Sequence, residues 1–230
     1  MLLLSLDTST TVCSAALHQD GALLGCYELF TERTSSAMLT TLIHDVVQHT
    51  GHELSQLDAI AVGKGPGSYT GLRIGVSTAK GLCFALNKPL LSVNTLAAMT
   101  EQLRAFYPAT YTLCPMIDAR RMEVYCAFYS AADGRELQAT AAEIIDEHSF
   151  SGWLTSGPVV FFGDGAAKCR AVLGDHPNAI FLGKLITPSA RTVGALAGAA
   201  FAEGRFEDVA TFEPFYLKEF MTAKPKPVVL

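Results

Sequence analysis

The sequence predicts an α/β protein of two lobes, each a mixed β-sheet flanked by helices. In the first hundred residues, short apolar runs typical of strands alternate with longer segments of helical periodicity, in the order βββαβαβα. A new series of strand-like runs then begins after Tyr107-Pro108. We therefore predict an N-terminal lobe over 1–107, a C-terminal lobe over 108–221 and a flexible tail over 222–230. A chain of 230 residues, half of them hydrophobic, is long enough for this division.

The predicted first lobe opens with three strands, at residues 2–6, 12–18 and 21–30. The turn signal His18-Gln19-Asp20-Gly21 joins the second and third strands as a hairpin. A helix is predicted from Ser35 or Ser36 to Thr50, because apolar residues recur there at helical spacing and Gly51 follows. The remaining elements of this lobe are a strand at 57–62, a helix at 68–86, a strand at 89–93 and a helix from Asn94 or Thr95 to about Phe106.

The predicted second lobe restarts with strands at 111–117, 123–129 and 136–139. An apolar run at 159–162 predicts a buried strand, which a short helix follows. An alanine-rich segment at 192–202 predicts a further helix, which Gly204 ends.

The charge balance bears on the class of ligand. The net charge is −5 and the isoelectric point is about 5.7. A protein that holds RNA by itself usually presents a basic face, because neutralisation of phosphates dominates the affinity. The composition therefore argues against a free-standing RNA-binding protein, although it allows one basic patch or a partner that supplies one.

Cysteine usage and the start of the chain indicate the compartment. None of the six cysteines forms a C-x-x-C pair, so we expect buried free thiols in a reducing compartment. The apolar start is short, lacks a basic region and reaches Asp7, which does not fit a signal peptide. No stretch approaches the roughly 20 apolar residues that span a membrane. We expect a cytoplasmic protein without a membrane segment.

A glycine-rich turn, Gly63-Lys64-Gly65-Pro66-Gly67-Ser68, links the predicted strand 57–62 to the helix 68–86. Ser68 is a suitable N-cap residue. The turn could hold an anion at the helix N-terminus, but its spacing matches neither G-x-x-x-x-G-K-[ST] nor G-x-G-x-x-G. A tight turn with a close backbone contact is the favoured alternative, and a phosphate cradle is the other.

The helix 68–86 carries a stripe of very small residues, Gly71, Gly75 and Ala79, at positions i, i+4 and i+8. A glycine inside a helix costs about 0.8–1.0 kcal/mol relative to alanine. The stripe therefore indicates that another backbone approaches closely. That neighbour is either the chain's own sheet or helix, or a helix of a partner protein.

Four segments of the chain resemble the TsaB family (bacterial YeaZ-type proteins). They lie in the family's order and span nearly the whole chain: LSLDTS at 4–9, GPGSYTGLRIGVSTAKGL at 65–82, IDARRMEVY at 117–125 and EPFYLK at 213–218. The long glycine block is the most specific of the four. TsaB-like chains often carry a histidine near the start of the first helix, where this sequence has Thr34-Ser35, so no role is carried over from that position.

The resemblance implies an actin/hexokinase-like ATPase (ASKHA) fold and an accessory role in forming threonylcarbamoyladenosine on tRNA. In that family the paralogue TsaD is the catalytic subunit, which binds a metal and transfers threonylcarbamoyl from its adenylate to the adenine next to the anticodon. TsaB-like proteins bind TsaD through helices of the first lobe, and a small ATPase, TsaE, joins the pair. The implied function is to organise the TsaD-like subunit and to help recruit the TsaE-like ATPase, with tRNA contacted only through the complex. ATP or ADP and the divalent metal are expected to belong to the partners, with no cofactor on the isolated chain.

One local comparison bears on catalysis. In TsaD-like chains the corresponding strand leads into an H-x-x-x-H metal pair on a helix. Here Thr95 and Met99 occupy the two histidine positions. A hydroxyl and a thioether are poor substitutes for two imidazoles at a divalent metal site. The resemblance therefore implies no catalytic residue and no metal site on this chain.

The predicted partner interface lies on the helices 36–50 and 68–86. Its residues are Met38, Leu42, Val46, Gly71, Leu72, Gly75, Thr78, Ala79 and Leu82. We expect Gly75→Leu to abolish partner binding while leaving the fold largely intact. Without the partner, the small-residue stripe is expected to pair with itself in a homodimer.

Weaker nucleotide or cleft contacts are predicted at Asp7, Thr8, Ser9, Arg120, Gly163, Asp164 and Gly165. The charges around Arg120 form either a solvated turn with salt bridges or a polar contact surface, where this residue meets a nucleotide or an acidic side chain. Gly163-Asp164-Gly165 is either a plain strand-to-helix turn or a remnant of a nucleotide loop.

The competing hypothesis is a stand-alone small ATPase, kinase or protease that uses Asp7 and the glycine loops. No Ser/His/Asp or metal constellation in the sequence supports proteolysis. The six histidines show no ligand spacing with a carboxylate, and we expect them at the surface or at helix ends.

Overall fold

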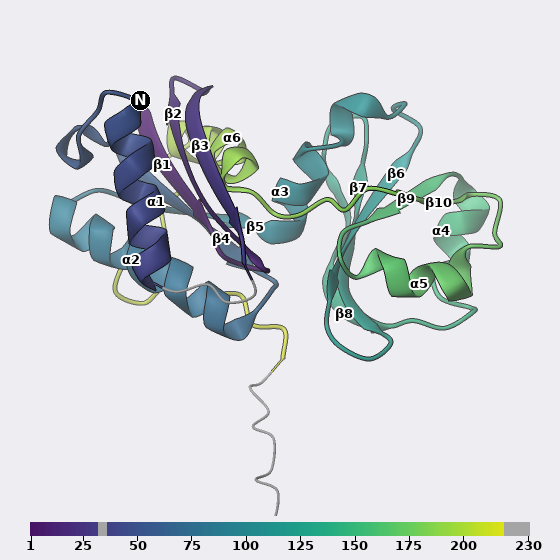
Figure 1. Cartoon of the computed structure of the whole chain (residues 1–230). Coiled ribbons are helices and arrows are strands. Elements are labelled where there is room, and N and C mark those ends of the chain that lie inside the picture. Colours follow the sequence, from purple (N-terminus) through teal and green to yellow (C-terminus); the bar gives the residue numbers. More distant parts are fainter. Residues whose placement is uncertain (32–35, 219–230) are drawn as a thin grey trace, which may run out of the picture.

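The computed structural model describes residues 1–31 and 36–218 as two lobes, each built on a five-stranded mixed sheet (Figure 1). The first sheet has the order β3-β2-β1-β4-β5. Its antiparallel half comprises β1 (Leu2–Asp7), β2 (Val12–Gln19) and β3 (Ala22–Phe30). Its parallel half adds β4 (Ala59–Gly65) and β5 (Leu90–Asn94) beside β1.

The second sheet repeats this topology, in the order β8-β7-β6-β9-β10. Here β6 (Thr112–Asp118), β7 (Glu123–Ser130) and β8 (Glu136–Ile144) are antiparallel. The strands β9 (Val159–Phe162) and β10 (Ala179–Phe181) run parallel to β6. The two lobes are therefore equivalent in strand order, and β6 corresponds to β1.

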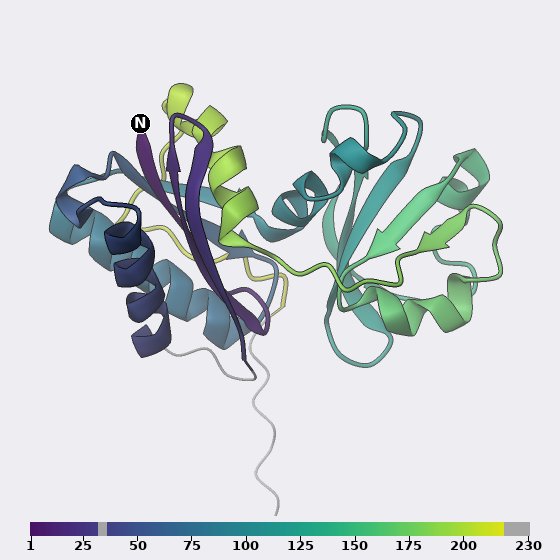
Figure 2. The ribbon, with the colours of Figure 1, turned by 45° about the horizontal axis from the view of Figure 1, so that its top comes forward.

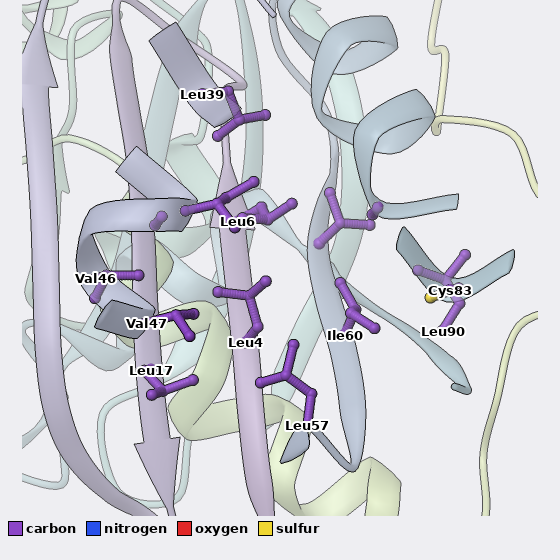
Figure 3. Packing of buried hydrophobic residues seen from close by; sticks show 14 of the residues in the cluster. Leu4, Leu6, Leu17, Leu39, Val46, Val47, Leu57, Ile60, Cys83 and Leu90 are labelled. Atoms are coloured by element: carbon purple, nitrogen blue, oxygen red, sulfur yellow. The ribbon is translucent and has the colours of Figure 1, made fainter. Parts of the chain in front are cut away.

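Helices cover both faces of the first sheet because its central strands are apolar on both sides. Leu4 and Leu6 of β1 point toward α1 (Ser36–His49) and α2 (Tyr69–Leu86) and share one core cluster with Leu39, beside which Leu6 lies (Figure 3). Leu3 points to the opposite face, which α6 (Ala190–Ala202) covers (Figure 2). On the second lobe, α3 (Thr95–Glu101) packs against β6 and β7, whereas α4 (Ser151–Ser156) and α5 (Ala166–Leu173) border the other core.

The actin/hexokinase-like architecture and the predicted order of elements along the first lobe are confirmed, with differences at element ends. The third helix stops at Glu101 instead of Phe106, because Leu103 and Tyr107 turn into the core of the second lobe and a 3₁₀ turn (Arg104–Phe106) lies between them. The short elements α4, β10 and the 3₁₀ turn Leu54–Gln56 were not predicted. The possible helix start at Ser35 and the tail 222–230 lie outside the described residues.

The structure corrects the predicted C-terminal boundary of the second lobe. Residues 190–212 fall within the predicted C-terminal lobe 108–221, yet the structure places them on the first lobe. The cause is an apolar face of α6, including Val193 and Ala197, which packs against Leu3 and neighbouring strand residues. Beyond α6, Glu207 forms an antiparallel bridge with Leu90 of β5.

The thiols and histidines test two smaller predictions. All six cysteines are free, and all but the half-buried Cys26 are buried. His18, predicted at the surface, is instead buried beneath α6, where desolvation lowers the pKa of its imidazole. In the described part of the chain, no helix has both the length and the apolar character to cross a membrane.

Candidate functional site

The glycine turn after β4 packs directly onto the loop after β1. The Ser68 amide donates a hydrogen bond to the Ser9 carbonyl oxygen at 2.7 Å. A Cβ atom on Gly67 would lie 2.2 Å from the same oxygen, so this position requires glycine. The Ser68 hydroxyl caps α2 by accepting from the Gly71 amide. The structure therefore shows the close backbone contact that was favoured over a phosphate cradle.

Asp7, at the end of β1, is fully buried. Its Oδ1 accepts hydrogen bonds from the Ser9 amide at 3.0 Å and from the Ser9 hydroxyl at 2.7 Å. Its Oδ2 has no hydrogen-bond partner and faces Gly63, where a Cβ atom would lie 2.2 Å away. Burial raises the pKa of Asp7 to about 6, against the hydrogen bonds from Ser9. Thr8 donates to the Gly71 carbonyl at 2.7 Å, so Asp7, Thr8 and Ser9 are all engaged inside the first lobe.

The equivalent position of the second lobe is Asp118, at the end of β6. Its carboxylate accepts from Lys168 Nζ and from the Arg120 amide. Partial burial acts to raise the pKa of Asp118, but these hydrogen bonds hold it below its usual value. Arg120 is exposed and its backbone has a φ of 72°. The cluster therefore forms a turn with salt bridges, and the structure does not test a contact of Arg120 with a ligand.

The Gly163-Asp164-Gly165 turn closes onto β6. A Cβ atom on Gly163 would lie 2.2 Å from the Met116 carbonyl oxygen, and one on Gly165 would lie 2.9 Å from the Ile117 carbonyl carbon. Asp164 accepts a hydrogen bond from the Asp118 amide at 2.9 Å. These contacts describe a tight strand-to-helix turn, with its glycines set against backbone.

The helix α3 carries the two residues that stand in place of a histidine pair. Asn94 caps this helix by accepting from the Leu96 amide at 2.8 Å. Thr95 and Met99 are both fully buried, and the Thr95 hydroxyl has no hydrogen-bond partner. The Met99 methyl lies against Gly163, where a Cβ atom would be only 2.8 Å away. Within residues 1–31 and 36–218, no three His, Cys, Asp or Glu side chains are grouped so that they could hold a metal ion.

The small-residue stripe on α2 faces the protein's own interior, which corrects part of the predicted interface. A Cβ atom on Gly71 would lie 2.1 Å from the Thr8 carbonyl oxygen, and one on Gly75 would lie 2.4 Å from the Thr8 hydroxyl. The backbone that approaches the stripe is therefore the loop after β1. Of the nine predicted interface residues, five are buried within the first lobe: Val46, Gly71, Leu72, Gly75 and Ala79. The other four are half-buried: Met38, Leu42, Thr78 and Leu82.

The surface that α1 and α2 present to solvent uses different residues. The outward side of α2 carries Arg73, Ser77, Gly81 and Phe84, and the Phe84 side chain is 85% exposed. A groove of about 400 Å³ runs along this side from the start of α1. Its lining residues are Ser36, Tyr69, Thr70, Arg73, Ile74, Ser77 and Thr78. We call this surface the α1/α2 face; sequence periodicity located its helices, but it did not show which side each of them turns outward.

The fold defines a class: a two-lobed actin/hexokinase-like protein, in which the loop after β1 and the glycine turn after β4 pack on one another. A family model described as TsaD, tRNA N6-adenosine threonylcarbamoyltransferase, matches residues 29–222. The tRNA threonylcarbamoyladenosine biosynthesis protein TsaB of Escherichia coli K12 is 33% identical over 99% of both chains. The protein of the same name from Bacillus subtilis 168 is 28% identical over 76% of each chain. The chain therefore belongs to the TsaB family, within the wider group that the TsaD model describes.

Solved structures agree with this assignment. YeaZ from Pseudomonas aeruginosa is 30% identical, with a TM-score of 0.80 over 94% of this chain and 99% of that one. The activator of the 2-hydroxyisocaproyl-CoA dehydratase from Clostridium difficile, with bound ADPNP, has a TM-score of 0.51 at 12% identity, which shows a shared fold alone.

Proposed function

We propose that this chain is a non-catalytic, cytoplasmic subunit required for threonylcarbamoyl transfer to the adenine next to the anticodon in tRNA. The match to E. coli TsaB over 99% of both chains carries this proposal. The buried Thr95 and Met99 support an accessory role, because the Met99 methyl fills the space beside Gly163. The net charge of −5 supports contact with tRNA through the complex and not by this chain alone.

The proposed docking site for a TsaD-like catalytic subunit is the α1/α2 face. Phe84 offers an exposed aromatic anchor, and Ser77 and Gly81 let a partner helix approach closely. The same face would assemble the surface that recruits a TsaE-like ATPase. In the absence of the partner, we propose that two copies of this chain pair through the α1/α2 face.

The direct test is co-expression with the TsaD-like protein of the same organism, followed by size exclusion and a threonylcarbamoyl-transfer assay. We expect a stable complex, transfer by the complex, and none by either chain alone. Transfer by the TsaD-like protein at the same rate without this chain would contradict the accessory role. Transfer by this chain alone would show that it is an enzyme.

A long, charged side chain in the groove should separate docking from folding. Ser77→Arg is expected to weaken binding of the TsaD-like subunit at least tenfold, because Ser77 lines the groove and faces solvent. Thr155→Arg, on the exposed side of α4, is the matched control and should bind like the parent chain. Calorimetric titration measures both affinities, and thermal unfolding should show little change in either variant. Unchanged affinity for Ser77→Arg would place the docking site elsewhere.

The competing ATPase hypothesis has its own test. Calorimetry with ATP and Mg²⁺ on the isolated chain is expected to show no submicromolar binding, because Asp7, Thr8 and Ser9 are turned into the core. Tight binding with turnover would favour an enzyme of the same superfamily over the accessory subunit.

A further inference from the structure

The described segment after α6, residues 203–218, runs back along the first lobe and reaches the region between the lobes (Figures 1 and 2). Glu207 accepts a hydrogen bond from Ser92 of β5 at 2.5 Å. Lys80 of α2 then donates to the carbonyl oxygens of Ala210 at 3.2 Å and Phe212 at 2.9 Å. These contacts lay the segment along β5 and α2 before it reaches the second lobe.

Residues 213–218, which we call the C-terminal strap, bind first to the beginning of α2. The Phe215 amide donates to the Lys64 carbonyl oxygen at 2.8 Å. The Tyr216 ring lies 4.9 Å from the Tyr69 ring, centroid to centroid. Arg73 donates to the Tyr69 hydroxyl at 3.0 Å, and its guanidinium lies 5.3 Å from the centroid of the Tyr69 ring. Tyr69 and Arg73 both line the groove of the α1/α2 face.

The other end of the strap binds the second lobe. Lys218 forms an ion pair with Glu123, the first residue of β7. Its Nζ also lies 5.9 Å from the centroid of the Tyr125 ring. The Glu123 side chain is only 22% exposed, so this pair is better shielded from solvent than a free surface pair. A pocket of about 40 Å³ remains where the strap, the glycine turn and Tyr125 meet.

The strap differs in position from the other polar links between the lobes. Asn94 donates to Thr140 at 2.9 Å, and Gln102 donates to the Thr187 carbonyl at 2.7 Å. Those two links flank α3, beside the covalent connections between the lobes. The strap instead joins the start of α2 to the start of β7, which makes it a separate tie between the lobes.

We propose that the C-terminal strap latches the two lobes through Lys218 and Glu123, and that the contacts from Tyr216 to Tyr69 and from Tyr69 to Arg73 couple the interlobe angle to docking in the α2 groove. The coupling half rests on the function proposed above. Partner binding and lobe closure would then be linked, so that each favours the other. A partner seated on the α1/α2 face would stabilise the closed latch, and an open latch would weaken docking.

The latch is tested first on the isolated chain. Spin labels are attached at Ala202→Cys, at the end of α6, and at Thr155→Cys, on α4, so that they report the distance between the lobes. Cys26→Ser removes the half-buried native thiol, and the remaining native thiols are buried. Labelled chain is diluted with unlabelled chain to suppress distances within a homodimer. Glu123→Ala and Lys218→Ala should each broaden the interlobe distance distribution, and the double variant should broaden it no further. Arg135→Ala, on an exposed side chain at the opposite end of the β7–β8 hairpin from Glu123, is the control.

An unchanged distribution in both single variants would overturn the latch, provided that thermal unfolding shows that they are folded. Additive broadening in the double variant would show that the two side chains act separately, which also overturns it.

The coupling is tested by calorimetric titration of the same variants with the TsaD-like subunit. We expect affinity to fall about threefold to tenfold in each latch variant, with the double variant no weaker than either single one. Broadened distances with unchanged affinity would overturn the proposed coupling, whereas the proposed latch would still be supported. Failure of the parent chain to bind would instead refute the proposed function and with it the coupling, while the distance measurements would still decide the latch.

Discussion

Gly71→Ala is expected to lower the free energy of unfolding by about 2–4 kcal/mol. The added Cβ atom would lie 2.1 Å from the Thr8 carbonyl oxygen, a separation that no folded protein tolerates, so the loop after β1 must move. That movement would also break the hydrogen bond from the Thr8 hydroxyl to the Gly71 carbonyl. Urea-induced unfolding followed by circular dichroism measures the effect.

The same helix offers a matched control. Gly81 is exposed and a Cβ atom there would meet no atom within 4 Å. Gly81→Ala is therefore expected to raise the free energy of unfolding by up to about 1 kcal/mol, through helix propensity alone. Equal effects of the two substitutions would contradict the packing of α2 on the loop after β1.

This contrast changes the meaning of the Gly75→Leu experiment expected from the sequence. Gly75 faces the Thr8 hydroxyl inside the lobe, so a leucine at this position would destabilise the fold and would not contact a partner. Loss of partner binding in that variant would therefore report unfolding. The exposed Ser77 is the residue that can report docking.

Asp7→Asn is expected to make the protein about 3 kcal/mol more stable at pH 8, with the difference disappearing below about pH 4. Burial raises the pKa of Asp7 from 3.8 to about 6, so the folded protein holds the proton more tightly than the unfolded chain does. The carboxyl group therefore stabilises the fold least above pH 6, and stability is lost as the pH rises from about 4 through 6. Asparagine removes the charge and keeps an oxygen that can accept from Ser9.

The measurement is a series of denaturant titrations of both proteins between pH 4 and pH 8. His18 contributes in the opposite sense: burial lowers the pKa of its imidazole, so stability is lost as the pH falls below the ordinary imidazole pKa of about 6.5. This contribution is common to both proteins and cancels in their difference. Parallel stability profiles would show that Asp7 does not titrate in this range.

The sequence predicted an element correctly where the periodicity of that segment alone determines whether it forms a helix or a strand. The apolar run that opens the chain, the hairpin signal before Gly21 and the helical spacing from Met38 to Val47 each place an element within a few residues of its position. Short elements such as α4 and β10 escaped, because six and three residues carry too little periodicity to be recognised. The repeated topology of the two sheets rests on pairing between distant strands, which no local window contains.

For the candidate site, too, some features could be predicted from the sequence and others depended on the tertiary structure. The sequence by itself determined the order of most elements along the chain, the capped helix at Ser68, the absence of a histidine pair at Thr95 and Met99, and the family. Only the tertiary structure decided that α6 belongs to the first lobe, that the small-residue stripe faces the Thr8 loop, and that the strap reaches Glu123. The reason is physical: a stripe of small residues shows that a backbone comes close, but long-range packing alone selects which backbone it is.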